Sequence, residues 1–324
     1  MFDYKATLTQ ILKEKEEDGG IKSVYFVACG GSFSALYPAK YFLQSEAKDL
    51  IVGHYSSNEF CHSTPKALGK NSIVYACSLM GNTPETAEAA RIGREAGAAV
   101  FALTVAPEAP LAKNSEFIVD HRGDFNDISN SNIANALRFA VELLNQTEGY
   151  EYYEQMMDGF GKINRIVASA KEICAPRAAA FAQSYKDEKL FYTMASGSSL
   201  GAAYQFAICI LMEMQWVNAS AIHSGEYFHG PFEITDRSLP FILLMSEGRT
   251  RALDQRALDF LKRFADRVTV LDAKELGINT IADTVSEFFN PLVFVSCLRV
   301  YAEALSEARQ HPMKTRRYMW KLEY

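Results

Sequence analysis

Short runs of apolar residues alternate along this chain with longer segments whose apolar positions recur every three or four residues. Uninterrupted apolar runs of this length are typical of strands in a parallel sheet that is buried on both faces. The segments between them, such as TPETAEAARIGREAGA at residues 83–98, have the spacing of amphipathic helices. The alternation predicts an α/β fold with doubly wound parallel sheets. The predicted strands cover residues 24–29, 51–55, 72–78, 99–105 and 116–121, and then residues 189–196, 220–224, 240–246 and 267–273.

Three further segments are predicted to be helical. Residues 1–18 have an amphipathic pattern that ends at Gly19 and Gly20, and their interspersed acids and lysines are not those of a signal peptide. Residues 151–187 have a mostly helical pattern, and a long helix is expected at about residues 291–309. The basic stretch that follows, KTRRYMWK, is interpreted either as a clamp on an anionic ligand or a neighbouring subunit, or as a solvated tail.

The two halves of the chain contain a related motif. ACGGSFSALY at residues 28–37 and ASGSSLGAAY at residues 195–204 are identical at five of ten positions, and each follows a predicted strand and opens a predicted helix. The shift of 167 residues is close to half of the 324-residue chain, which predicts two similar domains in tandem. We expect a first domain with its N-terminal helix, a helical bridge, a second domain and a basic tail, at residues 1–150, 151–187, 188–310 and 311–324.

Composition narrows the function without changing the predicted fold. With 48% hydrophobic residues, 22% charged residues and a net charge of −6, the chain lacks the strongly basic surface that nonspecific nucleic-acid binding requires. Nucleic acid is therefore not expected as a partner. A membrane is not expected either, because no apolar run reaches the ~18 residues of a membrane span. The six cysteines form no CxxC pair, which favours reduced thiols in a cytoplasmic protein over a zinc site.

Hydroxyl and amide side chains follow two of the predicted strands, which is where ligands bind in doubly wound folds. One loop, SLMGNT, leads into a helix that begins at Pro84, and a second loop, CGGSFSA, opens the helix after the first strand. Such loops form phosphate cradles, although ordinary helix capping by Ser and Thr is the alternative. Neither loop is a Walker or GxGxxG motif, which favours a small phosphate ester over a nucleotide. The predicted phosphate-binding residues are Ser32, Ser78, Asn82 and Thr83, with Gly31 as a further candidate.

One carboxylate, Glu213, lies within the otherwise apolar run AICILMEMQW. An ionised carboxylate is unfavourable in apolar surroundings, so it usually has a partner or a chemical role, and an ion-paired or surface-facing glutamate is the alternative. The following HSGEYFHGPFE places His229 beside a Gly-Pro turn and near Glu226 and Glu233. A glutamate and a histidine suit proton transfer at neutral pH, although Glu226 could instead cap the turn. No spacing matches a metal motif such as HExxH, and we expect neither a metal nor a cofactor.

These motifs resemble those of the sugar isomerase (SIS) domain proteins over nearly the whole chain, as a tandem of two SIS domains. VACGGS, SLMGNTPET and SGEYFHGP are similar to motifs in the isomerase half of glucosamine-6-phosphate synthase. ICILMEMQW, IHSGEYFHGPFEI and the ending HPMKTRRYMWKLEY resemble more closely the Amadori-product deglycases, which act on fructoselysine 6-phosphate, glucoselysine 6-phosphate or 6-phosphofructose-aspartate. The resemblance implies two flavodoxin-like three-layer sandwiches and a small-molecule sugar phosphate as the partner.

The resemblance also implies roles for individual residues. Glu213 matches the general base, and His229 matches the histidine that assists ring opening and can reach the site from a neighbouring subunit, which implies a homodimer with its active site at the interface. Lys321 lies near the position of a C-terminal active-site lysine. Met80 departs from the usual Ser-x-Ser-Gly loop and removes one hydroxyl. The residues that match the phosphate loops are Ser32, Ser78, Asn82 and Thr83.

We therefore expect a deglycase that hydrolyses a fructosamine 6-phosphate to glucose 6-phosphate and a free amine. Glu213 would move a proton from C1 to C2 through an enaminol, and water would hydrolyse the resulting imine. An aldose–ketose phosphosugar isomerase or an aminosugar-phosphate deaminase would use the same residues, and a non-catalytic sugar-phosphate sensor is a further alternative. The identity of the amine stays open, and unranked candidates for contacts to it are Glu59, His62, Glu226, Arg316 and Arg317.

Overall fold

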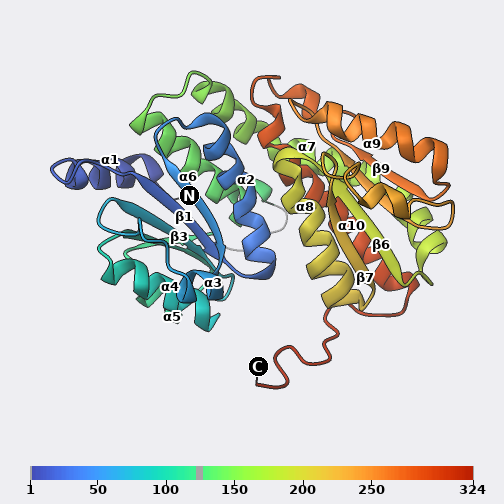
Figure 1. Cartoon of the computed structure of the whole chain (residues 1–324), viewed down its shortest axis with the longest axis horizontal. Coiled ribbons are helices and arrows are strands. Elements are labelled where there is room, and N and C mark those ends of the chain that lie inside the picture. The colour runs from blue at the N-terminus through green and yellow to red at the C-terminus, as the bar shows by residue number, and fades with distance from the viewer. Residues whose placement is uncertain (1, 122–126, 324) are drawn as a thin grey trace. The chain divides into compact units, whose positions relative to one another are not determined.

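The computed structural model describes residues 2–121 and 127–323 of the chain. The chain divides into two compact units, Met1–Met157 (unit 1) and Asp158–Tyr324 (unit 2). Each unit contains one parallel sheet with helices packed on it (Figure 1). All nine predicted strands are observed, each within two residues of its predicted ends.

Unit 1 is built on a five-stranded parallel sheet with the strand order β2-β1-β3-β4-β5. Its strands are β1 (Ser23–Ala28), β2 (Ile51–Ser56), β3 (Ser72–Cys77), β4 (Ala99–Thr104) and β5 (Phe117–Asp120). Its helices are α1 (Tyr4–Lys15), α2 (Gly30–Glu46), α3 (Ser57–His62), α4 (Pro84–Glu95), α5 (Pro110–Lys113) and α6 (Asn132–Thr147). The sheet order is that of a doubly wound fold, in which strands are added on one side of β1 and then, from β3 onwards, on its other side.

Successive side chains of the central strands pack into two different hydrophobic cores, one on each face of this sheet. Val74 and Val100 pack with Ala90 of α4 on one face. On the other face the ring of Tyr75 lies 4.5 Å from the ring of Phe139 in α6. In Figure 1, α3, α4 and α5 lie below the strands of unit 1 and α6 lies above them. Burial on both faces is the reason that these strands are uninterrupted apolar runs.

Unit 2 repeats this arrangement with one strand fewer. Its parallel strands have the order β7-β6-β8-β9, which corresponds to β2-β1-β3-β4 of unit 1 and confirms the predicted tandem of similar folds. The domain limits drawn from the sequence stay a prediction. The strands are β6 (Leu190–Ala195), β7 (Asn218–His223), β8 (Phe241–Met245) and β9 (Val268–Asp272). The main helices are α7 (Tyr153–Tyr185), which runs across the division between the units, α8 (Leu200–Gln205), α9 (Arg251–Phe264) and α10 (Asn290–Ala308).

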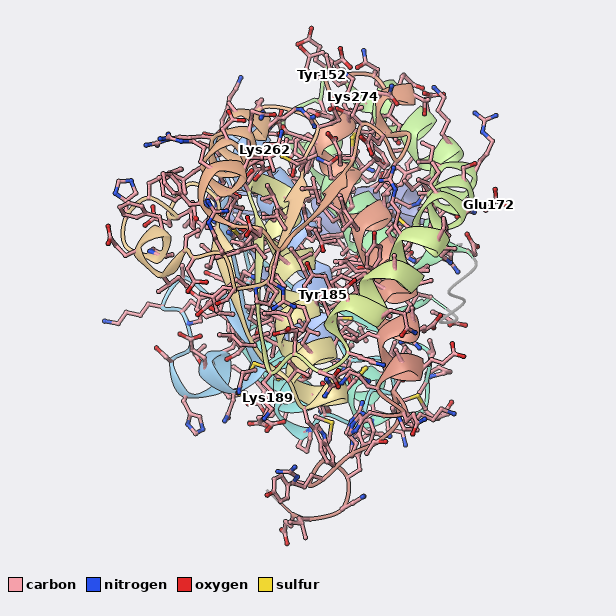
Figure 2. The ribbon with its side chains drawn as sticks, turned by 90° about the vertical axis from the view of Figure 1, so that its right-hand side faces the viewer. Tyr152, Glu172, Tyr185, Lys189, Lys262 and Lys274 are labelled. Atoms are coloured by element: carbon pink, nitrogen blue, oxygen red, sulfur yellow. The ribbon has the colours of Figure 1, made fainter. Side chains whose placement is uncertain are left out.

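The helix α10 is a core helix of unit 2. The ring of its Tyr301 lies 5.3 Å from the ring of Phe181 in α7, and Figure 2 shows α7, with Glu172 and Tyr185 labelled, running beside α10. The segment Ser286–Ala308 is the one described helix that could cross a membrane by length and composition, which differs from the sequence-based expectation. However, 72% of its apolar window is buried inside the protein, as in the core helix of a globular fold.

The helix that follows β6 changes its winding along its length. The short α8 continues without a break into η3 (Phe206–Met214), which is a π-helix. The apolar pattern of this stretch predicts an ordinary helix, because apolar residues at most positions do not distinguish one winding from the other. π-Helical turns are rare and are frequently found at functional sites. Glu213 lies in the last turn of η3, so the structure singles out the same stretch as the sequence did.

Candidate active site

Two loops of unit 1 meet at the carboxyl ends of its central strands. β1 and β3 are adjacent, and their last residues, Ala28 and Cys77, are paired in register. Each strand is followed by a helix, since α2 begins at Gly30 and α4 begins at Pro84. The two loops that were predicted separately as phosphate cradles therefore lie side by side, as expected at the reversal point of a doubly wound sheet.

Ser78 and Thr83 lie in the loop before α4, and Ser32 lies in the first turn of α2. The hydroxyls of Ser78 and Thr83 are hydrogen-bonded to each other at 3.0 Å. Burial raises the pKa of the Cys77 thiol to about 12, and a hydrogen bond with the hydroxyl of Ser32 opposes this rise, so Ser32 lies beside the end of β3. Asn82 is exposed between them in the second loop. The structure thus gathers hydroxyl groups from both loops at one edge of the sheet.

The alternative interpretation of these residues was helix capping. Thr83 stands at the N-cap of α4 but its side chain makes no capping hydrogen bond, and Cys29 at the N-cap of α2 makes none either. The amide groups in the first turn of each helix are therefore not satisfied by the side chain at its N-cap. Backbone amides at helix N-termini, together with the helix dipole, favour a bound anion. This arrangement supports the phosphate interpretation over simple capping.

The second loop is held in its shape by its neighbours. The carbonyl oxygen of Leu79 accepts hydrogen bonds from the hydroxyl of Thr104 and from the backbone N–H of Val105, both at 3.0 Å. Gly81 has a φ of +63°, and a Cβ atom there would lie 2.6 Å from the Cβ of Ala109. A glycine is required for both reasons. The exposed side chain of Met80 (55%) leaves this backbone geometry intact, although it adds no hydroxyl.

Glu213 is paired with a residue of the C-terminal tail. Its Oε1 lies 2.7 Å from Nη2 of Arg316, and the side chains of Glu213 and Arg316 are 25% and 8% exposed. Burial raises the pKa of Glu213, and the charge and hydrogen bond of Arg316 only partly oppose this rise. A carboxyl group with a raised pKa is a stronger base than an ordinary carboxylate. The ion pair itself matches the alternative drawn from the sequence, and it does not exclude a role as a base.

The basic tail folds back onto the end of η3 rather than extending freely into solvent over its whole length. Nε2 of Gln215 donates to the carbonyl oxygen of His311 at 3.0 Å, and the guanidinium of Arg317 lies 4.4 Å from the ring centre of Trp216. Nζ of Lys321 donates to the carbonyl oxygen of Arg316 at 2.6 Å. In Figure 1 the tail leaves unit 2 at the lower end of the helical segment that carries Glu213.

His229 lies on a compact turn that follows β7. Its backbone N–H donates to the carbonyl oxygen of Glu226 at 2.9 Å, and both residues are exposed. Gly230 has a φ of +135°, and the 3₁₀-helix η4 (Pro231–Ile234) follows at once. The buried Tyr227 anchors the turn in the core of unit 2. Within the described ranges, no hydrogen bond or ion pair joins His229 to Glu213, so the two are separate features of this unit.

The predicted site residues therefore fall into three groups. Ser32, Ser78 and Thr83 lie together in unit 1, Glu213 lies with the tail in unit 2, and His229 lies with Glu226 on its turn. Glu59 and His62 are exposed on α3 of unit 1. Sequence reasoning missed the contact of Arg316 with Glu213, and the signal available was a cluster of cations beside aromatic residues in KTRRYMWK. Over residues 2–121 and 127–323, no group of three or more His, Cys, Asp or Glu side chains could hold a metal ion.

The fold and the site define a class, the SIS-type enzymes that act on sugar phosphates. No family model matches the chain. Its sequence is 44% identical over 305 residues to fructosamine deglycase FrlB of Bacillus subtilis (strain 168), covering 94% of this chain and 93% of that protein. It is 27% identical over 277 residues to fructoselysine 6-phosphate deglycase of Escherichia coli (strain K12), covering 86% and 81%.

Solved structures agree with this assignment. A protein from Salmonella typhimurium LT2, provisionally called a phosphosugar isomerase, has a TM-score of 0.96 and 47% identity, covering 99% of this chain and 96% of that one. The C-terminal domain of glucosamine-fructose-6-phosphate aminotransferase from Francisella tularensis has a TM-score of 0.78 at 17% identity, covering 95% and 93%, and so shows the shared fold alone. The chain belongs to the fructosamine deglycase family of SIS-type enzymes.

Proposed function

We propose that this enzyme hydrolyses a fructosamine 6-phosphate to glucose 6-phosphate and a free amine or amino acid. The observation that carries the proposal is Glu213, a half-buried carboxyl group with a raised pKa on a π-helix. The phosphate-type loops of unit 1 and the similarity to two deglycases support the same reaction.

The chemistry follows from a proton shift between two neighbouring carbons. After the ring opens, the substrate carries its amine on C1 and a ketone at C2. Glu213 removes a proton from C1 to give an enaminol and returns a proton at C2, which leaves an imine at C1. Water adds to the imine and the amine departs, so that C1 becomes the aldehyde of glucose 6-phosphate. His229 assists ring opening and proton transfer, since an imidazole can serve as a general acid or base.

The loops of unit 1 would bind the phosphate of the substrate. Ser32, Ser78 and Thr83 offer hydroxyl groups, Asn82 offers an amide, and the first turns of α2 and α4 offer backbone N–H groups. A firmly held phosphate restrains C1 and C2 of the substrate in one orientation, which raises the rate of both proton transfers. Gly31 contributes backbone to the first turn of α2, and Lys321 and Glu226 are further candidates for contacts to the substrate.

We further propose that the enzyme is a cytoplasmic homodimer whose active site includes His229 of the neighbouring subunit. The exposure of His229 and its separation from Glu213 support a role towards a second chain. The cysteines found as free thiols suit a reducing compartment: Cys29, Cys61, Cys77, Cys174, Cys209 and Cys297. Sedimentation of the purified protein would test the dimer, and activity restored by mixing inactive Glu213→Gln and His229→Ala variants would test the shared site.

The reaction is tested by incubating the purified enzyme with fructoselysine 6-phosphate and following glucose 6-phosphate with a coupled dehydrogenase. Release of glucose 6-phosphate by the wild type, and its loss in Glu213→Gln, would support the proposal. Interconversion of fructose 6-phosphate and glucose 6-phosphate without release from any ketosamine phosphate would instead identify an isomerase. Binding of sugar phosphates without turnover of any of them would identify a sensor.

A further inference from the structure

The guanidinium of Arg316 is buried with an unused donor. Nη1 donates to the carbonyl oxygens of Met313 and Thr315, both at 2.9 Å, which fixes the orientation of the group. Nη2 is paired with Glu213. Nε is buried and has no hydrogen-bond partner among the residues that the structure describes. A buried donor without a partner is unfavourable and therefore suggests a ligand that is not yet bound.

The free donor lies on the edge of Arg316 that recognises carboxylates. Nε–H and Nη2–H of an arginine point in the same direction and together bind both oxygens of one carboxylate. Glu213 uses only the Nη2 side of this edge, through Oε1. A carboxylate that took both donors would displace Glu213, because the two anions would compete for Nη2. Such a carboxylate would make two charge-assisted hydrogen bonds where Glu213 makes one.

We propose that Arg316 binds the carboxylate of the amino-acid part of the substrate, and that this carboxylate takes the guanidinium from Glu213 and so frees the base. The inference rests on the proposed deglycase reaction, in which the leaving amine is attached to C1, the carbon that Glu213 deprotonates. An amino acid attached through its amine brings a carboxylate near that carbon. The exchange makes binding of the correct amine and release of the base a single event.

The consequence for Glu213 follows from the signs of its interactions. Burial raises the pKa of Glu213, whereas the charge and hydrogen bond of Arg316 lower it. When Arg316 moves to another anion, only the first effect is left and the carboxylate becomes a stronger base. A substrate without a carboxylate would leave the ion pair in place, and proton removal from C1 would be slower.

The test compares two substrates that differ only in this charge, the ketosamine 6-phosphates of glycine and of glycinamide. We expect wild-type kcat/KM to favour the glycine conjugate by about 10–100-fold, which is the range for a charge-assisted hydrogen bond. In Arg316→Met this preference should fall to about threefold or less, since no fork is left to recognise the carboxylate. Arg316→Lys, which keeps the charge without the fork, should lie between them. Lys314→Met removes an exposed charge from the same tail and should keep the wild-type preference.

Three outcomes would overturn the inference. Equal kcat/KM values of the wild type for the two conjugates would show that no carboxylate is recognised. A loss in Arg316→Met by the same factor for both conjugates would make Arg316 a structural residue of the tail. A loss for both together with weaker binding of inorganic phosphate would assign Arg316 to the phosphate instead. If the wild type turned over neither conjugate nor any other ketosamine phosphate, the proposed function itself would fail.

The pH dependence of kcat provides an independent test. A purely structural role of Arg316 would not make this dependence differ between the two conjugates. In wild-type enzyme saturated with the glycine conjugate, Arg316 is away from Glu213, so the acidic limb of kcat should lie at higher pH than with the glycinamide conjugate. In Arg316→Met the two limbs should coincide at the higher position. Coincident limbs in the wild type would contradict the exchange of partners.

Discussion

The third strand of each unit leads into a helix through a loop that starts with serine, and the two loops differ in what they hold. In unit 1, Ser78 follows β3, and its hydroxyl forms a 3.0 Å hydrogen bond with the hydroxyl of Thr83 in the same loop. In unit 2, Ser246 follows β8 and its backbone N–H donates to Oδ2 of Asp254 at 3.0 Å. Asp254 lies in the first turns of α9 and is fully buried. A carboxylate of the protein itself thus occupies the kind of place where an external anion would bind.

The loops after the first strands differ in the same way. Gly30 and Gly197 begin them with nearly equal φ values of +54° and +53°. Ser32 of unit 1 is partly exposed, whereas Ser198 of unit 2 is buried and its hydroxyl donates to the carbonyl oxygen of Glu287. Ser199 is also buried and accepts a hydrogen bond from Ser246 at 2.8 Å. The two copies share the left-handed glycine turn, but Ser32 is partly exposed where Ser198 and Ser199 are buried.

The comparison indicates a division of labour between the two copies. The carboxyl group of Asp254 accepts a hydrogen bond from the backbone N–H of Ser246, a loop amide that would otherwise be available to an anion. With the N–H of Ser246 bound internally, we expect no ligand at this loop of unit 2, whose candidate functional residues lie on η3 and on the turn of His229. The following predictions test this division, starting with the largest expected effect.

Removing the proposed base, Glu213, should have the largest effect on activity. Glu213→Gln keeps the shape of the side chain and removes its basicity, so we expect kcat to fall by about 10²–10⁴-fold. Binding of glucose 6-phosphate, measured by calorimetry, should change little, because the phosphate loops lie in the other copy. Glu303→Gln on the surface of α10 is the matched control and should retain full activity. A variant at position 213 with activity within tenfold of the wild type would refute its role as the base.

Removing the buried carboxyl group of Asp254 from unit 2 should lower the stability of the protein rather than weaken substrate binding. Asp254→Ala leaves the N–H of Ser246 without its acceptor, and we expect the free energy of unfolding to fall by about 1–3 kcal/mol. Added acetate should restore part of this loss by entering the vacated place. Asp259→Ala, a change on the same helix at an exposed carboxylate, should stay within about 0.5 kcal/mol in urea unfolding. Acetate that stabilises the wild type equally would contradict the interpretation.

The pH dependence of this effect has a defined sign. Burial raises the pKa of Asp254, and the hydroxyls of Ser224, Ser196 and Ser246 only partly oppose the rise. Between the ordinary pKa of about 3.9 and the raised value, the folded state binds more protons than the unfolded state, so its contribution to stability falls as pH increases. Asp254→Asn should remove this part of the dependence, as measured by urea unfolding across this range.

Equivalent serines in the two loops should give different kinetic results. Ser78→Ala should raise KM by about tenfold, because one hydrogen bond to a charged phosphate is lost. Ser246→Ala at the corresponding place of unit 2 should lower the melting temperature and leave KM within about twofold. If Ser246→Ala raised KM as much as Ser78→Ala, the second loop would also hold substrate and the comparison drawn above would be wrong.

The smallest effect is expected where the loop of unit 1 lacks a hydroxyl. Met80 is 55% exposed in this loop, so Met80→Ser can be made without disturbing the core. The new hydroxyl should lower KM by about two- to fivefold, in line with a modest gain from one hydrogen bond. Leu79→Ser places the same hydroxyl one residue earlier and should have less effect. Equal changes in both variants would show that position 80 does not face the phosphate.

The sequence alone could predict the fold and part of the site. Strands buried on both faces, such as β3, must be apolar throughout, and this constraint is visible without a structure. The repeated glycine after the first strand of each half reflects a left-handed turn, so it indicated two copies of one fold. Ser78 and Thr83 were singled out as candidates because ligand-binding residues of such folds follow the strands directly along the chain.

The sequence could not predict contacts between residues that are distant along the chain. Asp254 stands on a helix with an ordinary amphipathic pattern, and nothing local indicates that it is buried against the serines of unit 2. Arg316 was one of several unranked cations, and its pairing with Glu213 depends on how the tail folds back over Gln215 and Trp216. The π-helical winding of η3 also escaped prediction, because an almost uniformly apolar stretch contains no periodic signal.

The sequence by itself thus determined the two parallel sheets, their tandem repeat, the loops that follow the strands, and the carboxylate set within an apolar helix. Each of these features depends on the order and spacing of residues that are close together along the chain, and such local patterns determine which strands, helices and turns can form. Only the tertiary structure decided which loop holds an internal anion and which cation meets Glu213. Those outcomes depend on burial and charge partners contributed by remote segments, and such partners set the pKa of a carboxyl group and its availability as a base.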